Sequence, residues 1–165
     1  MTPPVTILLV EDDDDEFELA QIAFEALHLQ RYLVRMRHGK DLIDFLLARG
    51  KFKDRVIINK SAHLILLDIN MPVMGGHETL KQLKSDKTLR KLPVIMLTGS
   101  EREEDVIRAY DLGANSFIRK PFTAEQFIKV VTALELYWLN IVKLPPTNDL
   151  PGLTTNNPAE ATKTG

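Results

Sequence analysis

Short runs of branched apolar residues alternate along this chain with longer segments in which apolar residues recur every three or four positions. The short runs are continuous, which is typical of strands buried on both faces of a parallel sheet. The longer segments have the period of amphipathic helices. The predicted strands are Val5–Val10, Tyr32–Met36, His63–Leu67, Pro93–Leu97 and Ser116–Arg119. The predicted helices are Phe17–Leu27, Asp41–Ala48, His77–Lys84, Glu101–Leu112 and Ala124–Val142.

The order of these elements predicts an α/β fold with a parallel sheet and right-handed crossovers. Gly113 suits the end of the fourth helix, and Thr123 suits the N-cap of the last one. Arg49–Ala62 is polar and aperiodic, so we expect a solvated loop there. After Leu144 the chain is rich in Pro, Thr and Asn. We therefore expect one domain over residues 1–144 and a disordered tail over 145–165.

Composition narrows the functional classes. The chain has 165 residues, a formal net charge of −2 and no cysteine. These values argue against electrostatic binding to nucleic acid and exclude disulfides and thiolate chemistry. The sequence shows neither a secretory signal pattern nor an apolar run of roughly 18 residues that could cross a membrane. We expect a cytoplasmic protein that binds no membrane.

Polar residues that could bind a ligand or react lie directly after four of the predicted strands. Glu11 and Asp12 follow the first strand, Asp68 the third, Thr98 the fourth and Lys120 the fifth. Ligands of an open parallel sheet bind beyond the carboxyl ends of its strands, where the strand order reverses. We therefore expect these side chains to converge at one edge of the sheet.

The residue types in this set indicate phosphoryl chemistry on a metal. Carboxylates held close together repel one another, and a hard divalent cation such as Mg²⁺ relieves that repulsion. A lysine and a hydroxyl nearby add donors for a phosphoryl group. A carboxylate beside the cation and the lysine can itself accept the phosphoryl group as an acyl phosphate.

Several other polar residues favour structural interpretations. Asp13–Glu16 stand where acids stabilise the start of a helix, and Ser100 suits an N-cap. His63 and His77 form no ligand cluster in sequence. Gly75–Gly76 lacks the lysine of a nucleotide-binding P-loop.

Four motifs, in this order, resemble the receiver domain of two-component response regulators: LLVEDD, LILLDINMPVMGG, PVIMLTGS and FIRKPF. The resemblance spans about residues 5–142 and implies a flavodoxin-like fold with strand order 2-1-3-4-5 and an extended C-terminal helix. It implies a phosphorylated signalling switch rather than an enzyme. The metal would be Mg²⁺, for which Mn²⁺ can substitute. The implied phosphoryl and metal residues are Asp68 as phosphoacceptor, Asp12 as the main metal ligand, Glu11 as a water-mediated helper and Asn70 as a backbone carbonyl ligand.

The same resemblance implies which residues respond to phosphorylation and which kinase is the partner. Thr98 would bond a phosphoryl oxygen, Lys120 would pair with the phosphoryl charge, and Phe117 would be the aromatic switch residue. The Lys120–Pro121 bond would be cis. The C-terminal string ALELYWLNIVKLP resembles small single-domain regulators paired with cyanobacterial phytochromes, which implies a light-sensing histidine kinase as partner.

The last predicted helix is apolar on more than one face. One stripe, expected to face the core, contains Phe127, Val131, Leu134, Trp138 and Ile141. Further apolar residues, Leu139 among them, lie off that stripe, and a helix of this kind needs a second partner. That partner is either the chain's own domain, if the end of the helix folds back on it, or a second copy of the chain. We expect a homodimer through the fourth helix, fifth strand and fifth helix. The interface residues we assign are Ile128, Tyr137, Trp138 and Val142.

Two alternatives remain from the sequence. One is a Mg²⁺-dependent phosphatase or transferase that uses Asp68 as nucleophile. Such enzymes usually carry a second acid–base carboxylate just beyond the nucleophile, and Asn70 stands at that place. The other is an adaptor that does not use its phosphorylation site. The leading hypothesis is a single-domain response regulator without an output domain of its own.

Overall fold

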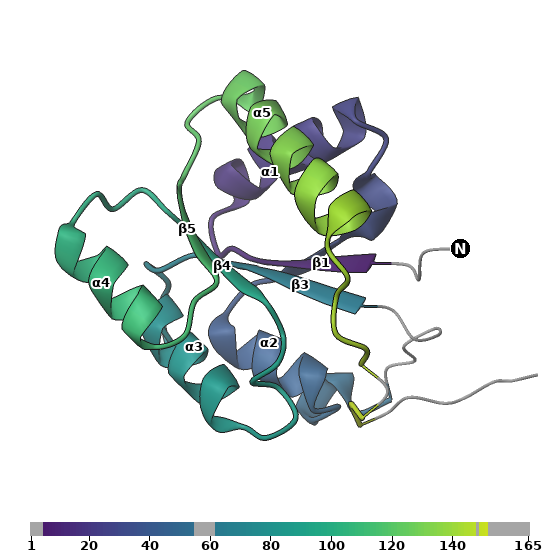
Figure 1. The fold of residues 1–165 in the computed structure, drawn as a ribbon, viewed down its shortest axis with the longest axis vertical. Coiled ribbons are helices and arrows are strands. Elements are labelled where there is room, and N and C mark those ends of the chain that lie inside the picture. Colours follow the sequence, from purple (N-terminus) through teal and green to yellow (C-terminus); the bar gives the residue numbers. More distant parts are fainter. Residues whose placement is uncertain (1–4, 55–61, 148, 152–165) are drawn as a thin grey trace, which may run out of the picture.

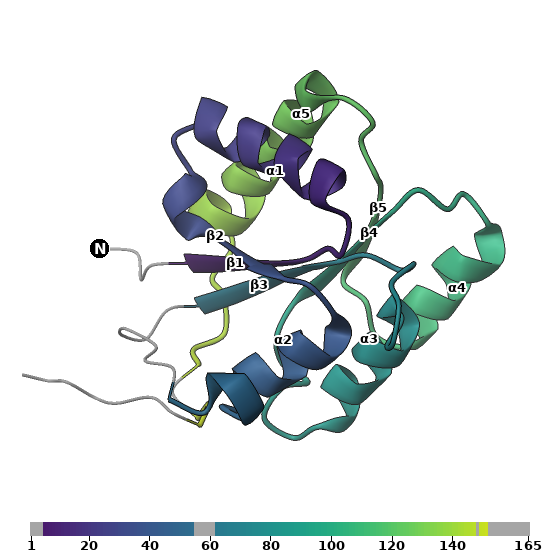
Figure 2. The same cartoon turned by 180° about the vertical axis from the view of Figure 1, so that it is seen from behind.

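A computed structural model describes residues 5–54, 62–147 and 149–151. Its centre is a five-stranded parallel sheet with the order β2-β1-β3-β4-β5. Helices cover both faces of this sheet, as the two opposite views in Figures 1 and 2 show. The predicted α/β fold and its strand order are confirmed.

The five strands lie close to their predicted positions. Because successive side chains of a strand point to opposite faces, each central strand contributes to two cores. Leu8 and Val10 belong to the core on one face of the sheet, whereas Ile7 and Leu9 belong to the core on the other. The strands are β1 (Val5–Val10), β2 (Leu33–Met36), β3 (Ala62–Leu67), β4 (Val94–Thr98) and β5 (Ser116–Arg119).

The helices form two layers. On one side of the sheet α1 and α5 pack together, and α2, α3 and α4 cover the other side (Figure 1). The α-helices are α1 (Asp14–Ala26), α2 (Gly39–Leu46), α3 (Gly76–Ser85), α4 (Glu103–Asp111) and α5 (Ala124–Leu134). Two short 3₁₀ segments, η1 (Gln30–Tyr32) and η2 (Gly50–Phe52), and a π-helical segment, η3 (Glu135–Ile141), complete the described elements.

Helix caps explain where several helices begin and end. The Asp13 side chain accepts a hydrogen bond from the Glu16 amide and caps α1, and Thr123 caps α5 in the same way. Gly113 follows α4 with a φ of +100°, a conformation that glycine adopts without strain. The prediction that Ser100 is the N-cap of α4 is wrong, because the N-cap is Arg102. The Ser100 hydroxyl instead donates to Asp105 at 2.6 Å.

The predicted helix over residues 124–142 changes its winding partway along. From Glu135 onward the segment is π-helical, and the Val142 amide bonds the carbonyl of Tyr137 at 2.8 Å. This wider turn alters the rotation per residue, so the predicted core-facing stripe fails at its end. Ile141 is 66% exposed, whereas Leu139, expected off the stripe, packs against the core.

The chain beyond residue 144 packs on the domain as far as it is described. Leu150 is 3% exposed and belongs to the core beneath α2 and α3, and Thr147 is fully buried. Lys91 pairs with Asp149 at 2.5 Å. Leu150 thus anchors the described part of the segment after residue 144 on the domain, and the boundary expected at residue 144 stays a prediction.

The loop expected over Arg49–Ala62 and the expected tail are described only in part. Of the loop expected over Arg49–Ala62, residues 49–54 include η2 and Ala62 begins β3, while residues 55–61 lie outside the described residues. Residues 152–165 of the expected tail also lie outside them. Within the described ranges, every helix is too short or too polar to pass through a lipid bilayer.

Candidate functional site

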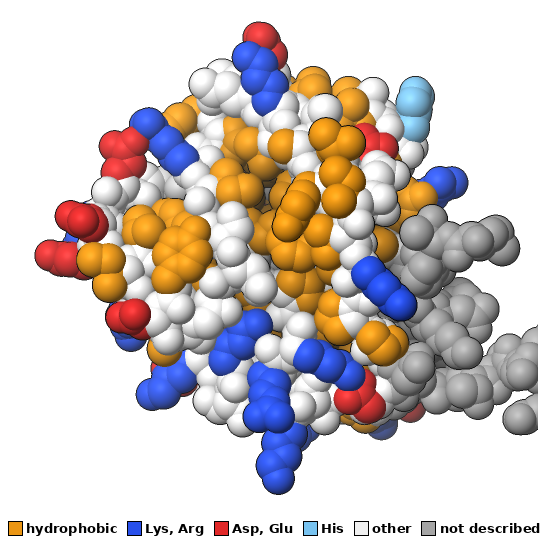
Figure 3. Space-filling model, in the orientation of Figure 1, with side chains coloured by type: hydrophobic (Ala, Val, Ile, Leu, Met, Phe, Trp, Pro, Cys, Tyr) orange, Lys and Arg blue, Asp and Glu red, His pale blue; other side chains and the backbone are white. Residues whose placement is uncertain are grey.

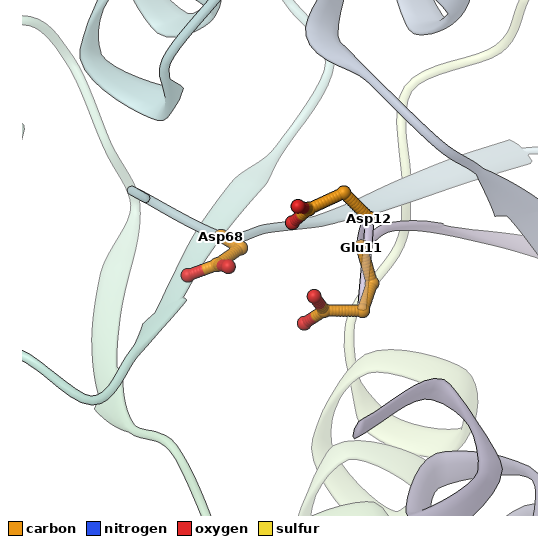
Figure 4. A group of neighbouring side chains, drawn as sticks. All are labelled: Glu11, Asp12 and Asp68. Atoms are coloured by element: carbon orange, nitrogen blue, oxygen red, sulfur yellow. The ribbon is translucent and has the colours of Figure 1, made fainter. Parts of the chain in front are cut away.

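Three carboxylates meet where β1 and β3 end. These strands are neighbours, and their register places Val10 beside Leu67. The next residues, Glu11 and Asp68, therefore leave the sheet at the same level. One carboxylate oxygen from each of Glu11, Asp12 and Asp68 lies within 4.8 Å of the other two. Figure 4 shows the three side chains around one point beyond the strand ends.

The ammonium of Lys120 joins this cluster from the end of β5. Its Nζ lies 2.5 Å from Glu11 Oε2 and 3.2 Å from Asp68 Oδ2. The Lys120 amide also donates to the Thr98 carbonyl at 2.7 Å, which ties the chain after β5 to the end of β4. Lys120, Glu11 and Asp68 are 6%, 2% and 5% exposed, so their charges interact with little screening by water.

Burial and charge act in opposite directions on the protonation of this cluster. Burial raises the pKa of Glu11 from 4.5 to about 7, although hydrogen bonding and charge from Lys120 oppose the rise. Burial also raises the pKa of Asp68, again opposed by Lys120. For Lys120, burial lowers the pKa, but the hydrogen bonds to Glu11 and Glu16 and the charges of Asp68 and Glu11 outweigh it and the pKa is raised.

Glu16 is a member of the site that the sequence analysis missed. It lies in the first turn of α1, where the acidic run predicts only stabilisation of the helix start. Its carboxylate pairs with Lys120 Nζ and is 43% exposed. The acidic run after β1 is the only signal in the sequence, and it does not distinguish Glu16 from its neighbours. The α1 register, set by the Asp13 cap, directs this one acid toward Lys120.

Thr98 ends β4 as a fully buried residue. Its Oγ1 accepts a hydrogen bond from the Ser100 amide at 3.1 Å, and the Ser100 hydroxyl bonds Asp105 in α4. Phe117, paired with Met96 in the sheet, is partly buried against the core on the α2–α3–α4 side. Thr98 is thus connected through two hydrogen bonds to the start of α4.

The two remaining predicted site positions give different results. The Asn70 backbone lies near enough to the Asp68 carboxylate to lower its pKa, against the larger effect of burial, and the role of the Asn70 carbonyl as a metal ligand stays a prediction. The expected cis bond between Lys120 and Pro121 is wrong, because this peptide is trans. Trans is the intrinsically favoured isomer even before proline, and the Lys120 side chain reaches Glu11 and Asp68 from it.

A glycine lets α3 lie against the chain that carries Asp68 beyond the end of β3. A Cβ on Gly76 would lie 2.2 Å from the Asp68 carbonyl oxygen and 2.7 Å from the Ile69 Cα. Only a residue without a side chain fits this contact. The Gly76 amide donates to the Ile69 carbonyl at 2.8 Å, so the first turn of α3 is fixed against the strand end that carries Asp68.

The donor set suits a hard divalent cation. Three carboxylate oxygens converge from two strand ends, and only oxygen atoms are offered, which is the chemistry that Mg²⁺, Mn²⁺ and Ca²⁺ prefer. Lys120 offsets part of the negative charge, and a cation beside Asp12 would offset the rest. The cluster is therefore a candidate site for a divalent cation next to a buried lysine.

Comparison with known proteins places the chain in a family. The family model described as the response regulator receiver domain matches residues 7–132. The response regulator Rcp1 of Synechocystis sp. is 34% identical over 143 residues, which are 87% of this chain and 95% of that protein. This chain belongs to the response regulator receiver domain family, as the sequence motifs predicted.

Solved structures of similar proteins agree with this assignment. The Mn²⁺-bound form of Rcp1 is 35% identical, with a TM-score of 0.72, over 86% of this chain and 99% of that one. The phosphorylated cyanobacterial phytochrome response regulator RcpA is 33% identical, with a TM-score of 0.75, over 86% and 99%. The bacteriophytochrome response regulator RtBRR is 37% identical, with a TM-score of 0.66, over 89% and 86%.

Proposed function

We propose that this protein is a signalling switch that accepts a phosphoryl group on Asp68 from a histidine kinase. The observation that carries the proposal is the position of Asp68, whose buried carboxylate lies 3.2 Å from Lys120 Nζ and within reach of the Glu11 and Asp12 oxygens. A nucleophile, a cationic partner for the phosphoryl group and a metal-binding pair of acids thus share one point. Membership in the receiver family supports the same role.

The reaction we propose is an in-line transfer. An Asp68 oxygen forms a bond to the phosphorus of a phosphohistidine, the N–P bond breaks, and the imidazole nitrogen keeps the electron pair. Lys120 stays protonated, because its pKa is raised, and pairs with the transferred group. Later hydrolysis of the acyl phosphate by water returns Asp68 and inorganic phosphate.

The metal we propose is Mg²⁺, held by Asp12, Asp68 and the backbone carbonyl of Asn70, with Glu11 acting through a water molecule. When bound, it would neutralise carboxylate charge and the charge on the phosphoryl oxygens. The Mn²⁺-bound form of Rcp1 supports a divalent cation in this family. The convergence of Glu11, Asp12 and Asp68 supports one in this chain.

Phosphorylation would be transmitted through Thr98. The phosphoryl group draws the Thr98 hydroxyl toward Asp68, and the loop bonded to Thr98 through the Ser100 amide follows. That loop holds α4 through the bond between Ser100 and Asp105. Phe117 then moves into the space that Thr98 leaves, which changes the surface of α4, β5 and α5. The output is a change in protein–protein binding.

The kinase partner we propose is a phytochrome. RcpA and RtBRR are named as phytochrome response regulators, and each covers more than four fifths of this chain. The C-terminal string that suggested this class in the sequence folds here as the end of α5 and the π-helical segment. The partner would be a light-sensing histidine kinase.

Acetyl phosphate tests the site without a kinase. The protein is incubated with acetyl phosphate and Mg²⁺, and its intact mass is measured. We expect one added phosphoryl group, which Asp68→Asn abolishes and which Asp111→Asn, an exposed acid of α4, leaves unchanged. A wild type that takes up no phosphoryl group from acetyl phosphate or from any phytochrome kinase contradicts the proposal. Steady turnover of small phosphomonoesters would favour an enzyme instead.

We also propose a homodimer through the α4–β5–α5 face. Figure 3 shows apolar side chains gathered along α5 and the π-helical segment. Tyr137 is 53% exposed there, and Trp138 packs edge-on against it at 5.3 Å between ring centroids. Ile128 and Val142, the other assigned interface residues, are partly exposed. A groove of about 420 Å³ beside them is lined by Ile118, Lys129, Val130, Ala133, Leu134, Tyr137 and Trp138.

Light scattering tests the dimer. We expect the mass of two chains for the wild type at tens of micromolar and the mass of one chain for Tyr137→Arg, because a charge in an apolar interface disfavours association. Ile22→Arg, a matched change at a 44% exposed residue of α1, should leave the dimer intact. A monomeric wild type, phosphorylated or not, contradicts this proposal.

A further inference from the structure

Arg35, in the edge strand β2, holds the backbone of the turn that carries the metal-binding acids. Its Nε donates to the Glu11 carbonyl at 3.0 Å, and its Nη2 donates to the Asp12 carbonyl at 3.1 Å. Its Nη1 lies 2.6 Å from the Asp14 carboxylate. One planar guanidinium is thus bonded to Glu11 and Asp12 in the turn after β1 and to Asp14 at the start of α1.

The position of Arg35 is itself well determined. In the sheet it pairs with Leu9, so both side chains lie on the α1 side. The guanidinium lies over the ring of Phe17 in α1, at 4.6 Å from its centroid, and the side chain is 15% exposed. Because guanidinium is rigid and offers its donors in a fixed fork, these contacts define where the two carbonyls must be.

The turn after β1 must bring the carboxylates of two successive residues to the same place. Successive side chains of an extended chain point to opposite faces, yet Glu11 and Asp12 place carboxylate oxygens within 4.8 Å of one another and of Asp68. The backbone must therefore bend between Glu11 and Asp12. Arg35 bonds the carbonyls of these same two residues, on both sides of the bend.

We propose that Arg35 is a positioning residue that holds the turn over residues 11–14 in its cation-binding shape and so raises the affinity for a divalent cation. This inference rests on the metal site proposed above. Arg35 acts through the backbone of Glu11 and Asp12 and does not itself touch the cation. Residues that orient metal ligands typically change the affinity for metal when they are replaced.

Charge and positioning predict opposite effects for Arg35. A positive charge near the site repels a cation, so its removal would strengthen binding if charge alone mattered. Loss of the two carbonyl bonds would weaken binding. The matched control is Arg37, which pairs with the same Asp14 oxygen at 3.1 Å and is 53% exposed. Within the described residues, its one hydrogen bond goes to that side chain and none to the turn carbonyls.

A Mn²⁺ titration separates these effects. Free Mn²⁺ is followed by electron paramagnetic resonance in the wild type, Arg35→Gln, Arg35→Lys and Arg37→Gln. We expect about 10-fold weaker binding in both Arg35 variants, although Arg35→Lys keeps the charge. Binding by Arg37→Gln should be equal to or tighter than that of the wild type. Wild-type affinity in Arg35→Lys, or tighter binding in Arg35→Gln, overturns the inference.

Two further measurements distinguish a failure of the Arg35 inference from a failure of the proposed metal site. Mn²⁺ binding that persists in Asp12→Asn would show that the proposed site is wrong. The hold of Arg35 on the turn, which we call the clamp, is tested without metal. The probe is the Asp13 amide, which donates to Glu11 Oε1 at 3.0 Å. By NMR, this amide should exchange with water about 10-fold faster in both Arg35 variants than in the wild type and Arg37→Gln. Equal exchange rates in all four proteins overturn the clamp, whatever the metal does.

Discussion

Lys120 Nζ lies 3.2 Å from Asp68 Oδ2, although the two residues are 52 positions apart in the chain. Parallel strands β3 and β5 bring them together from either side of β4. Both side chains are buried, and the same ammonium also meets Glu11 and Glu16. Lys120 is therefore the main cation that offsets the carboxylates of the site when no metal is bound.

Replacement of Lys120 by methionine should destabilise the protein in a pH-dependent way. At pH 8 the variant leaves the Glu11 and Asp68 carboxylates buried without their cation, which costs about 3 kcal/mol or more. At pH 5 both carboxyl groups can take up a proton instead, because burial already raises their pKa values, so the loss should be smaller. Urea unfolding at the two pH values, with chelator present, measures the difference.

The control for this prediction is Lys81→Met, which removes an exposed lysine of α3. We expect it to change the free energy of unfolding by less than about 0.5 kcal/mol at either pH. If Lys120→Met loses the same stability at pH 5 as at pH 8, ionised carboxylates are not what Lys120 stabilises.

Stability and cation binding should vary with pH in opposite directions through Glu11. Its pKa is raised in the folded state to about 7 from 4.5, so between these values the folded protein holds the proton more tightly than the unfolded chain. The Glu11 contribution to stability therefore falls as pH rises through this window and levels off above about pH 7. At about 1.4 kcal/mol per pKa unit, the loss is at most about 3.5 kcal/mol.

A divalent cation should reverse this trend, because it binds the ionised form. Added Mg²⁺ should raise the melting temperature more at pH 8 than at pH 5. The difference between the wild type and Glu11→Gln gives the contribution of Glu11 to the pH dependence of stability and to the rise in melting temperature with Mg²⁺. Glu125→Gln, at an exposed glutamate of α5, serves as the control. A wild type and a Glu11→Gln variant with parallel stability profiles from pH 5 to pH 8 would show that Glu11 does not titrate in this range.

The sequence predicts the fold and the strand-end residues because both depend on local patterns. Continuous apolar runs locate five buried strands, and parallel topology requires that their ends meet. The proximity of Asp68 and Lys120 therefore follows from the sequence pattern alone. The register of α1 cannot be read in the same way, because Asp14, Asp15 and Glu16 are all acids of the first helical turn and the folded helix directs Glu16 toward Lys120.

The other misses share a physical cause. The π-helical turn after Leu134 leaves no mark in the apolar pattern of the sequence, so the helical period assigns Ile141 to the wrong face. Arg35 looks like an ordinary polar residue of an edge strand, and its three bonds arise only when β2 lies beside β1. Leu150 lies in a segment that is mostly polar, so the composition of the segment does not indicate that Leu150 is buried in the core.

Replacement of Leu150 by alanine tests whether the chain after α5 is part of the folded domain. Leu150 is 3% exposed in the core beneath α2 and α3, so the variant should lose about 2 kcal/mol or more of stability. Leu136→Ala, at a leucine that is 61% exposed, should change stability by less than about 0.5 kcal/mol. Denaturant unfolding measures both. Equal stability of the two variants would show that the segment does not anchor in the core.

Two glycines beside the site should respond differently to the same added methyl group. A Cβ on Gly76 would meet the Asp68 carbonyl oxygen at 2.2 Å, whereas a Cβ on Gly99 would find nothing within 4 Å. The Asp68 and Ile69 backbone directly follows β3, both residues are buried, and it cannot easily yield. Gly76→Ala should therefore cost about 1–3 kcal/mol of stability and slow phosphorylation by acetyl phosphate, because α3 and Asp68 must separate.

Gly99→Ala should keep wild-type stability within about 0.5 kcal/mol, or gain slightly through a less flexible unfolded chain. Urea unfolding gives the stability of both variants, and intact mass after timed exposure to acetyl phosphate gives the phosphorylation rate. A Gly76→Ala protein with wild-type stability and rate would mean that α3 does not press on the Asp68 backbone. The close approach at Gly76 would then have no part in holding Asp68 toward Lys120.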